Sequence, residues 1–296
     1  MDIVSQRRYL GMLLTATMLL FPLNCMGQNY HAVLIGIGQY PSSSGWNTIH
    51  GDNDIPLIKA SLINQGFPDE NITMILNEQA TKECILNSFE SLLSRIGKGD
   101  VVYIHFSGHG QQITDLNGDE DDGYDEAWIP YDAEKVYNEH RYHGENHLSD
   151  DELNKVFMKF RIRLSHSGKL IVIADACHSG SGSRGFSTDD EEFMRGTPDK
   201  FILPAAGLNK KAKADPEEWL FLAACKSYQS NYEYKSKDGT YYGILSYVIA
   251  TDTSDFTKSK YSSKIKDWRL EVLRLATRIQ DIVDEGQPSK LSSYLF

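Results

Sequence analysis

The sequence predicts an α/β fold with a mostly parallel central sheet covered by helices on both faces. Short apolar runs rich in β-branched residues recur along the chain, and such runs are typical of buried parallel strands. Amphipathic segments with helical periodicity separate these runs. Strands that alternate with helices favour a parallel sheet whose two faces are both covered.

Each predicted element follows from a local signal. The strands are expected at 30–37, 72–76, 101–106, 170–174 and 219–224, and the helices at 55–65, 81–96, 153–160, 243–251 and 267–283. Ser149, with Glu152 three residues later, forms a capping box for the third helix. The acidic run 52–54 stands before the first helix, so capping is an alternative role for Asp54. A long acidic loop is expected between the third strand and the third helix.

Length and composition limit the class of protein. The chain has 296 residues, of which 41% are hydrophobic, and this is enough for one large globular domain or two small ones. The net charge of −11 argues against a nucleic acid or an anionic membrane as partner.

Residues 1–27 have the pattern of a secretory signal. Arg7 and Arg8 precede an apolar stretch at 10–23, and a small-residue end follows at Gly27. We therefore expect an exported protein, periplasmic or secreted, without a membrane span in the mature chain. Lipid attachment at Cys25 is the alternative, although Asn24 makes a poor lipoprotein signal.

Cysteine and histidine follow two of the predicted strands. The mature chain has three cysteines, Cys84, Cys177 and Cys225, and an odd number at scattered spacing does not indicate a disulfide framework. Cys177 follows the fourth strand, at the edge where open α/β sheets bind ligands. His109, between two glycines, follows the third strand. A thiol and an imidazole that meet at one sheet edge have the arrangement of a thiol protease, whereas a structural buried cysteine is the alternative.

Several motifs in order carry a resemblance to a known family. Phe106-Ser107-Gly108-His109-Gly110 and Asp175-Ala176-Cys177-His178-Ser179-Gly180 resemble the catalytic motifs of the metacaspases, which are caspase-like cysteine peptidases. The acidic run 117–126 and Ser-Asp-Asp-Glu-Leu at 149–153 also match. The resemblance runs from about Tyr30 to the C-terminus. It implies a caspase-like α/β/α sandwich and one peptidase domain over 28–296.

The resemblance implies roles for the site residues. Cys177 would attack a peptide carbonyl, and His109 would bring positive charge to the thiolate and protonate the leaving amine. The backbone N–H groups of Cys177 and Gly110 would form the oxyanion hole. His178 is a rival base, but neighbouring side chains seldom face the same way. The residues expected to line the substrate pocket are Asp54, Ser107 and Asp175, and two carboxylates there favour Arg or Lys.

No cofactor is expected to be required, and the sequence leaves calcium open. The resemblance implies a calcium site at Asp125, Asp150 and Asp151, but Arg184 stands where a fourth acid is usual. The loop 115–126 spaces its oxygen donors like an EF-hand, yet Glu120 replaces the turn glycine. A solvated acidic surface is the alternative. His140, His143 and His147 match no zinc spacing and are expected at the surface.

The predicted function is a cysteine endopeptidase that cuts peptide or protein substrates after Arg or Lys. Self-cleavage is expected within the segment 181–216, which should be mobile and exposed. Its basic residues are Arg184, Arg195, Lys200, Lys210, Lys211 and Lys213. The alternatives are a clostripain- or gingipain-like peptidase, an inactive caspase-fold binding module, and a ligating enzyme on the same dyad.

Overall fold

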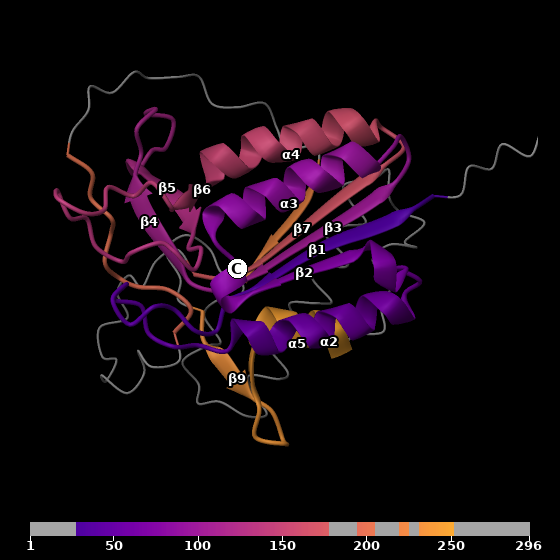
Figure 1. Cartoon of the computed structure of the whole chain (residues 1–296), viewed down its shortest axis with the longest axis horizontal. Helices are drawn as coiled ribbons and strands as arrows, with labels where there is room; N and C mark the ends of the chain where they lie inside the picture. The colour runs from indigo at the N-terminus through magenta and orange to yellow at the C-terminus, as the bar shows by residue number, and fades with distance from the viewer. Residues whose placement is uncertain (1–27, 178–193, 205–218, 225–230, 252–296) are drawn as a thin grey trace, which may run out of the picture.

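The central sheet of the computed structural model has five parallel strands in the order β2-β1-β3-β7-β8 (Figure 1). The structure describes residues 28–177, 194–204, 219–224 and 231–251. The strands are β1 (Tyr30–Gly36), β2 (Ile72–Leu76), β3 (Val101–Ser107), β7 (Lys169–Asp175) and β8 (Leu220–Ala223). The predicted strands and the parallel α/β sheet are therefore confirmed. The predicted signal at 1–27, the helix at 267–283 and Cys225 lie outside the described residues.

Helices cover both faces of the sheet. One face carries α3 (Lys82–Arg95) and α4 (Asp150–Leu164), and the other carries α2 (Gly51–Asn64) and α5 (Ile244–Thr251) (Figure 1). Alternate strand residues point to opposite faces. On β1, Val33 and Ile35 join the core beneath α3 and α4, whereas Ala32 and Leu34 join the core beneath α2 and α5. This gives the predicted α/β/α sandwich.

One helix begins at its predicted cap, and another does not. The side chain of Ser149 accepts a hydrogen bond from the Glu152 N–H at 3.4 Å, as the capping box predicts. The first helix begins at Gly51, earlier than predicted, and its N-cap residue His50 makes no side-chain capping bond. Asp54 therefore lies inside the first turn and is free for another role.

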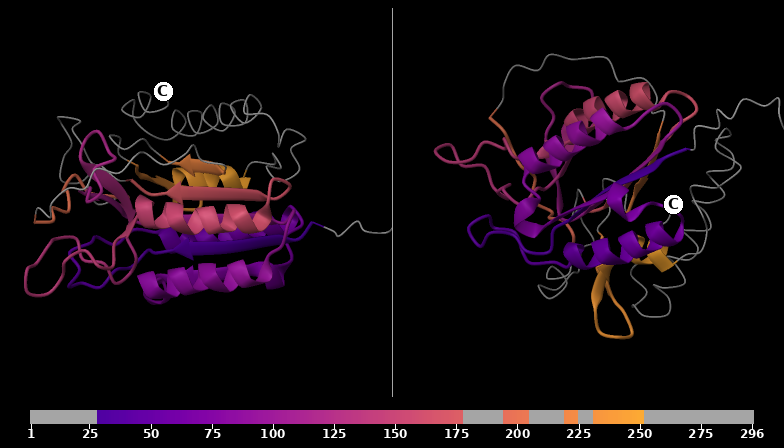
Figure 2. Two further views of the ribbon diagram at one scale, coloured as in Figure 1. Left: turned by 90° about the horizontal axis from the view of Figure 1, so that it is seen from above. Right: turned by 45° about the vertical axis from the view of Figure 1, so that its right-hand side comes forward.

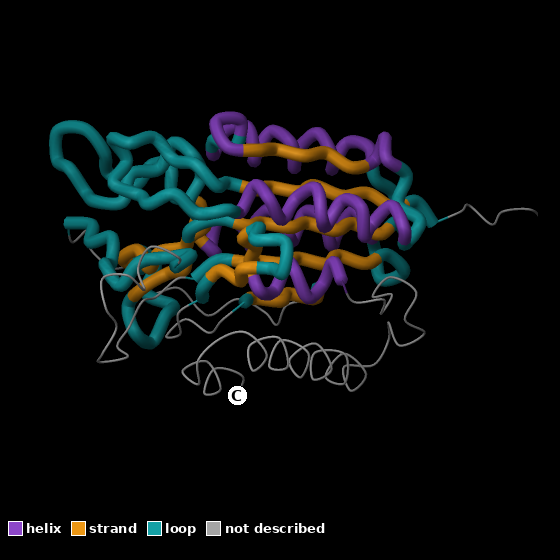
Figure 3. Tube along the Cα trace, turned by 90° about the horizontal axis from the view of Figure 1, so that it is seen from below, coloured by secondary structure: helices purple, strands orange, loops and turns teal. Residues whose placement is uncertain are grey.

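The predicted acidic loop is only partly correct, because residues 115–123 lie in a loop but the segments on either side of it form a second sheet. Its antiparallel strands are β4 (Gly110–Thr114), β5 (Tyr124–Trp128) and β6 (Leu148–Ser149). A hairpin of β9 (Glu233–Lys235) and β10 (Tyr241–Gly243) was also not predicted. Figures 2 and 3 show the second sheet and the longest loops gathered at one end of the molecule, beyond the carboxyl ends of the central strands.

The segment 181–216 was predicted to be exposed. Its described residues, 194–204, are instead partly buried. Met194, Arg195, Thr197 and Phe201 are buried. Met194 forms an antiparallel bridge with Tyr232, and Phe201 a parallel bridge with Ile113. Backbone pairing with Tyr232 and with Ile113 of β4 keeps these four residues from solvent, whereas residues 198–200 are exposed. Among the described residues, none of the helices is both long enough and apolar enough to cross a bilayer.

Candidate functional site

His109 and Cys177 follow the ends of two adjacent central strands. In the parallel pairing of β3 with β7, Ser107 lies opposite Asp175, and the Gly108 N–H donates to the Asp175 carbonyl at 3.4 Å. His109 and Cys177 each stand two residues beyond this pair, and both are almost fully buried. The sheet thus brings the two predicted catalytic residues to one edge.

The two N–H groups predicted for the oxyanion hole converge on one atom. The N–H of Cys177 donates to the carbonyl oxygen of Arg195 at 2.8 Å, and the N–H of Gly110 donates to the same oxygen at 3.3 Å. Two backbone donors that converge on one oxygen next to a cysteine could also stabilise an oxyanion.

The imidazole of His109 is held in one tautomer. Its Nε2 lies 2.9 Å from the carbonyl oxygen of Asn47, which can only accept, so the proton is on Nε2 and the lone pair on Nδ1. Nδ1 is buried and has no hydrogen-bond partner within the described part of the chain. Trp46 stacks on the ring at a centroid distance of 4.8 Å. This arrangement leaves Nδ1 able to take up a proton.

Burial determines the charge of His109. It lowers the pKa of the imidazole to about 4, so the ring is neutral at pH 7. This differs from the expectation that His109 brings positive charge to a thiolate. A neutral imidazole is able to accept a proton from a neighbouring thiol.

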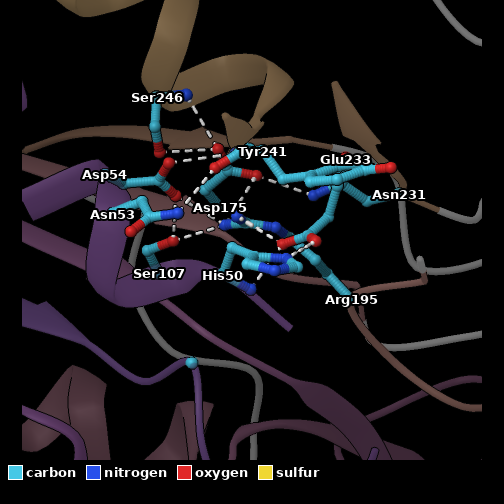
Figure 4. Close-up of polar contacts among 12 residues, drawn as sticks. His50, Asn53, Asp54, Ser107, Asp175, Arg195, Asn231, Glu233, Tyr241 and Ser246 are labelled. Atoms are coloured by element: carbon cyan, nitrogen blue, oxygen red, sulfur yellow. Dashed lines mark hydrogen bonds and ion pairs between the residues drawn. The ribbon is translucent and has the colours of Figure 1, made fainter. Parts of the chain in front are cut away.

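An acidic pocket encloses the side chain of Arg195 (Figure 4). We define the acid pocket as Asp54, Ser107, Asp175 and Glu233, all of them buried. Nη1 of Arg195 donates to Asp54 Oδ2 at 2.7 Å and also to Ser107 Oγ, and Nη2 donates to Glu233 Oε1 at 2.9 Å. Asp175 Oδ1 lies 3.9 Å from Nη1. The three residues predicted for the pocket are therefore together, and Glu233 joins them.

Neighbouring donors fix each carboxylate of the acid pocket. Asp175 accepts hydrogen bonds from the Asn231 amide at 2.7 Å and from the Ser246 hydroxyl at 2.6 Å. Asp54 accepts from the Gly243 N–H at 3.0 Å, so its side chain does not cap α2. The donors to Glu233 are the N–H and the ring of His50, at 2.7 and 2.5 Å. The pocket is thus preorganised by segments from across the chain.

The charge of the acid pocket suits a cation. Three buried carboxylates face a single guanidinium, and all four side chains are fully excluded from solvent. Burial raises the pKa of Asp54 to about 7, although the charge of Arg195 opposes this rise. The same carboxylates raise the pKa of Arg195 above its ordinary value. Without a cation the three acids would be uncompensated, which is costly in a buried site.

Sequence reasoning missed Glu233 and Asn231. Both lie in a short polar stretch, Asn231-Tyr232-Glu233, that has no motif and follows residues 225–230, which the structure does not describe. Their spacing of two residues places both side chains on one side of an extended strand. This two-residue spacing was the available signal for Asn231 and Glu233, but it does not predict that the strand lies beside the site.

The acids implied for calcium gather at the second sheet. Asp125 is on β5, and Asp150 and Asp151 open α4. Burial and neighbouring acids raise the pKa of Asp125 to about 7 and that of Asp150 to about 8. Carboxylate oxygens of Asp115, Asp119 and Asp125 lie within 4.8 Å of one another. Such hard oxygen donors suit Ca²⁺, and Asp125 is common to both sets.

The three histidines considered for zinc do not share a surface. His140 and His143 are exposed, as predicted. His147 is buried instead, and its ring bonds the Tyr142 hydroxyl at 2.8 Å and the Gln111 amide oxygen at 2.9 Å. Those two partners occupy both of its nitrogens, which leaves neither for a metal.

Comparison with known proteins gives one consistent family. The model of the metacaspase peptidase C14 domain matches residues 30–183. Metacaspase-1A of Neurospora crassa is 34% identical over 166 residues, which are 53% of this chain and 33% of the relative. Metacaspase-1 of Meyerozyma guilliermondii is 25% identical over 290 residues, covering 83% of this chain and 67% of the relative. The chain thus spans about a third of the Neurospora protein.

A solved structure agrees with the fold. A crystal structure of a Geobacter sulfurreducens protein superposes with a TM-score of 0.51 at 21% identity, over 74% of this chain and 80% of the other. The matched family domain spans the strands that carry His109 and Cys177. The chain belongs to the metacaspases, the caspase-like family of peptidase C14.

Proposed function

We propose that the protein is a cysteine endopeptidase that hydrolyses peptide bonds after arginine or lysine. The observation that carries the proposal is the position of Arg195. Its guanidinium lies among three buried carboxylates, while its carbonyl accepts from the N–H groups of Cys177 and Gly110. A basic substrate residue with its scissile carbonyl beside the thiol would make the same contacts.

The mechanism follows from the contacts of the site. His109 Nδ1 takes the proton of the Cys177 thiol, and the sulfur attacks the carbonyl carbon. The Cys177 and Gly110 N–H groups stabilise the oxyanion. His109 then donates its proton to the leaving amine, and water hydrolyses the thioester.

The acid pocket favours Arg over Lys. The guanidinium of Arg195 bonds Asp54 through Nη1 and Glu233 through Nη2, so two carboxylates are satisfied at separate atoms. A lysine ammonium is a single point charge and cannot reproduce this fork. Asp or Asn at the same position would leave the buried carboxylates unpaired.

A panel of fluorogenic peptides tests the proposal. Substrates that differ only in Arg, Lys, Asp or Asn before the cleaved bond are assayed with and without Ca²⁺. We expect Arg to be cut fastest, Lys more slowly and Asp not at all, and a calcium site at Asp125 predicts a faster rate with Ca²⁺. Cys177→Ala is the control that must abolish hydrolysis. Cleavage after Asp alone would contradict the proposal.

Activity is expected to depend on pH through the acid pocket. Burial raises the pKa of Asp54 to about 7, so its carboxylate is charged above this pH and protonated below it. The KM for Arg substrates should therefore rise as the pH falls from 8 to 6. His109, whose pKa burial lowers to about 4, stays neutral over that range, so kcat should change less. A KM that does not change over this range would contradict the role of Asp54.

We further propose export by the sequence 1–27 and self-processing within 181–216, as its basic residues suggest. Membership of the metacaspases argues against a clostripain-like enzyme, and the presence of both His109 and Cys177 argues against an inactive binding module. A ligating enzyme would instead transfer the acyl group to an added amine. Mass analysis of the peptide products distinguishes ligation from hydrolysis.

A further inference from the structure

We propose that the chain cuts its own Arg195–Gly196 bond, and that the site selects glycine after the cut. This inference rests on the proposed peptidase function and deepens it by naming one bond out of the basic residues in the linker. The structure holds this bond, in its own chain, where a substrate bond would lie.

The residues before the bond pair with the extended segment that leads into β9. Met194 forms an antiparallel bridge with Tyr232, and the N–H of Arg195 donates to the Asn231 carbonyl at 2.9 Å. An extended peptide that adds to a strand edge through main-chain bonds, with one side chain in a pocket, is a common mode of peptide recognition. Arg195 therefore has three contacts of the kind that a substrate would make: with the backbone of Asn231, with the acid pocket and with the N–H groups of Cys177 and Gly110.

Gly196, the residue after the bond, lies in close contact with Cys177. A Cβ added to Gly196 would overlap the carbonyl oxygen of Cys177 and come within 3.0 Å of the carbonyl carbon and Cβ of Cys177. These are atoms of the catalytic residue and its backbone, so they have little freedom to move aside. Glycine is the residue that fits this position without displacing Cys177.

The chain beyond the bond is anchored as well. The N–H of Phe201 donates to the Gln112 carbonyl at 2.8 Å, and the Thr114 N–H donates to the Phe201 carbonyl at 3.0 Å. The Phe201 side chain is 1% exposed. With both sides of the bond fixed to the same molecule, cutting should occur within one chain, at a rate independent of protein concentration.

The reaction balances with water alone. His109 Nδ1 accepts the thiol proton, the Cys177 sulfur bonds the Arg195 carbonyl carbon, and the bond to the Gly196 nitrogen breaks. That nitrogen takes the proton from His109 and leaves as a new amino terminus. Water then hydrolyses the thioester, which yields the Arg195 carboxylate and restores the thiol.

The test follows the full-length chain over time by intact mass and by amino-terminal sequencing of the fragments. We expect a fragment that begins Gly-Thr-Pro-Asp, from residue 196, at a rate unchanged by dilution. Arg195→Gln should abolish this fragment, and Arg195→Lys should retain it. Lys200→Gln, at an exposed basic residue, is the matched control.

Gly196→Ala should slow the cut about a hundredfold, because displacement of the reacting atoms by about 1 Å can lower the rate by that factor. Gly97→Ala is its control, since the nearest atom to an added Cβ there is at 3.8 Å.

A fluorogenic Arg peptide, assayed in parallel, separates this inference from the proposed function. Its dye leaving group does not depend on residue 196, so each chain of Gly196→Ala that has been cut should hydrolyse it at the wild-type rate. Peptide hydrolysis by a wild-type chain that stays intact, or is cut elsewhere, overturns the inference alone. Unaltered cutting of Gly196→Ala overturns the selection of glycine, and a rate proportional to concentration overturns cutting within one chain. Loss of both activities in the wild type overturns the proposed function too.

Discussion

His109→Asn is expected to lower kcat for an Arg peptide by about a thousandfold and to leave KM nearly unchanged. In the proposed mechanism the imidazole provides the proton acceptor at Nδ1, whereas the acid pocket around Arg195 is made by other residues. Asparagine keeps a polar group near the Asn47 carbonyl but cannot accept the thiol proton and later deliver it. Steady-state kinetics at saturating substrate measure the change.

A buried histidine elsewhere gives the matched control. His31 is 6% exposed on β1, and Tyr30 beside it pairs with Val101 at the start of β3, the opposite end of the sheet from the site. His31→Asn should therefore leave kcat within about twofold, even if it lowers stability. If His109→Asn keeps more than a tenth of the wild-type kcat, the base lies elsewhere. His178, which is outside the described residues, is then the next variant to make.

The central sheet could be predicted because its strands are buried on both faces. Leu170–Ala174 and Val101–Phe106 are apolar at nearly every position, which the sequence alone makes visible. The strands of the second sheet have no such signal. In Tyr124–Trp128 polar and apolar residues are mixed, and Asp125 is buried as fully as many core residues. From the sequence alone, an acidic stretch of this kind predicts a solvent-exposed loop, even though one of its carboxylates is buried among the other acids.

The meeting of His109 and Cys177 at one sheet edge could be predicted for a related reason. His109 and Cys177 follow strands whose ends the sequence marks with glycine and alanine, and parallel strands end at one edge. The place of Glu233 in the acid pocket could not be predicted. This residue stands 58 positions after Asp175, in a hairpin without a motif. Arg195 was predicted only as one basic residue of an exposed linker. Its burial depends on the combined position of Asp54, Asp175 and Glu233, which no local pattern contains.

Glu233→Gln is expected to lower kcat/KM for Arg peptides by roughly a hundredfold. Removing one partner of a buried ion pair costs about 3 kcal/mol, which corresponds to that factor. Glu233 Oε1 accepts from Nη2 of the arginine at 2.9 Å, and its side chain is fully buried, so water cannot replace the lost charge. Glutamine keeps the volume and one acceptor oxygen but removes the negative charge.

The effect on specificity is the sharper result. A lysine ammonium at the position of Nη1 would remain close to Asp54 and depend less on Glu233, so the Arg-to-Lys ratio of kcat/KM should fall in Glu233→Gln. Asp238→Asn removes the same charge from the exposed turn of the same hairpin and is the matched control, for which the ratio should not change. If both variants reduce Arg and Lys cleavage equally, Glu233 acts only through the overall charge of the protein. A ratio that falls only in Glu233→Gln assigns the discrimination to the contact between Glu233 and Nη2, since the two variants have the same net charge.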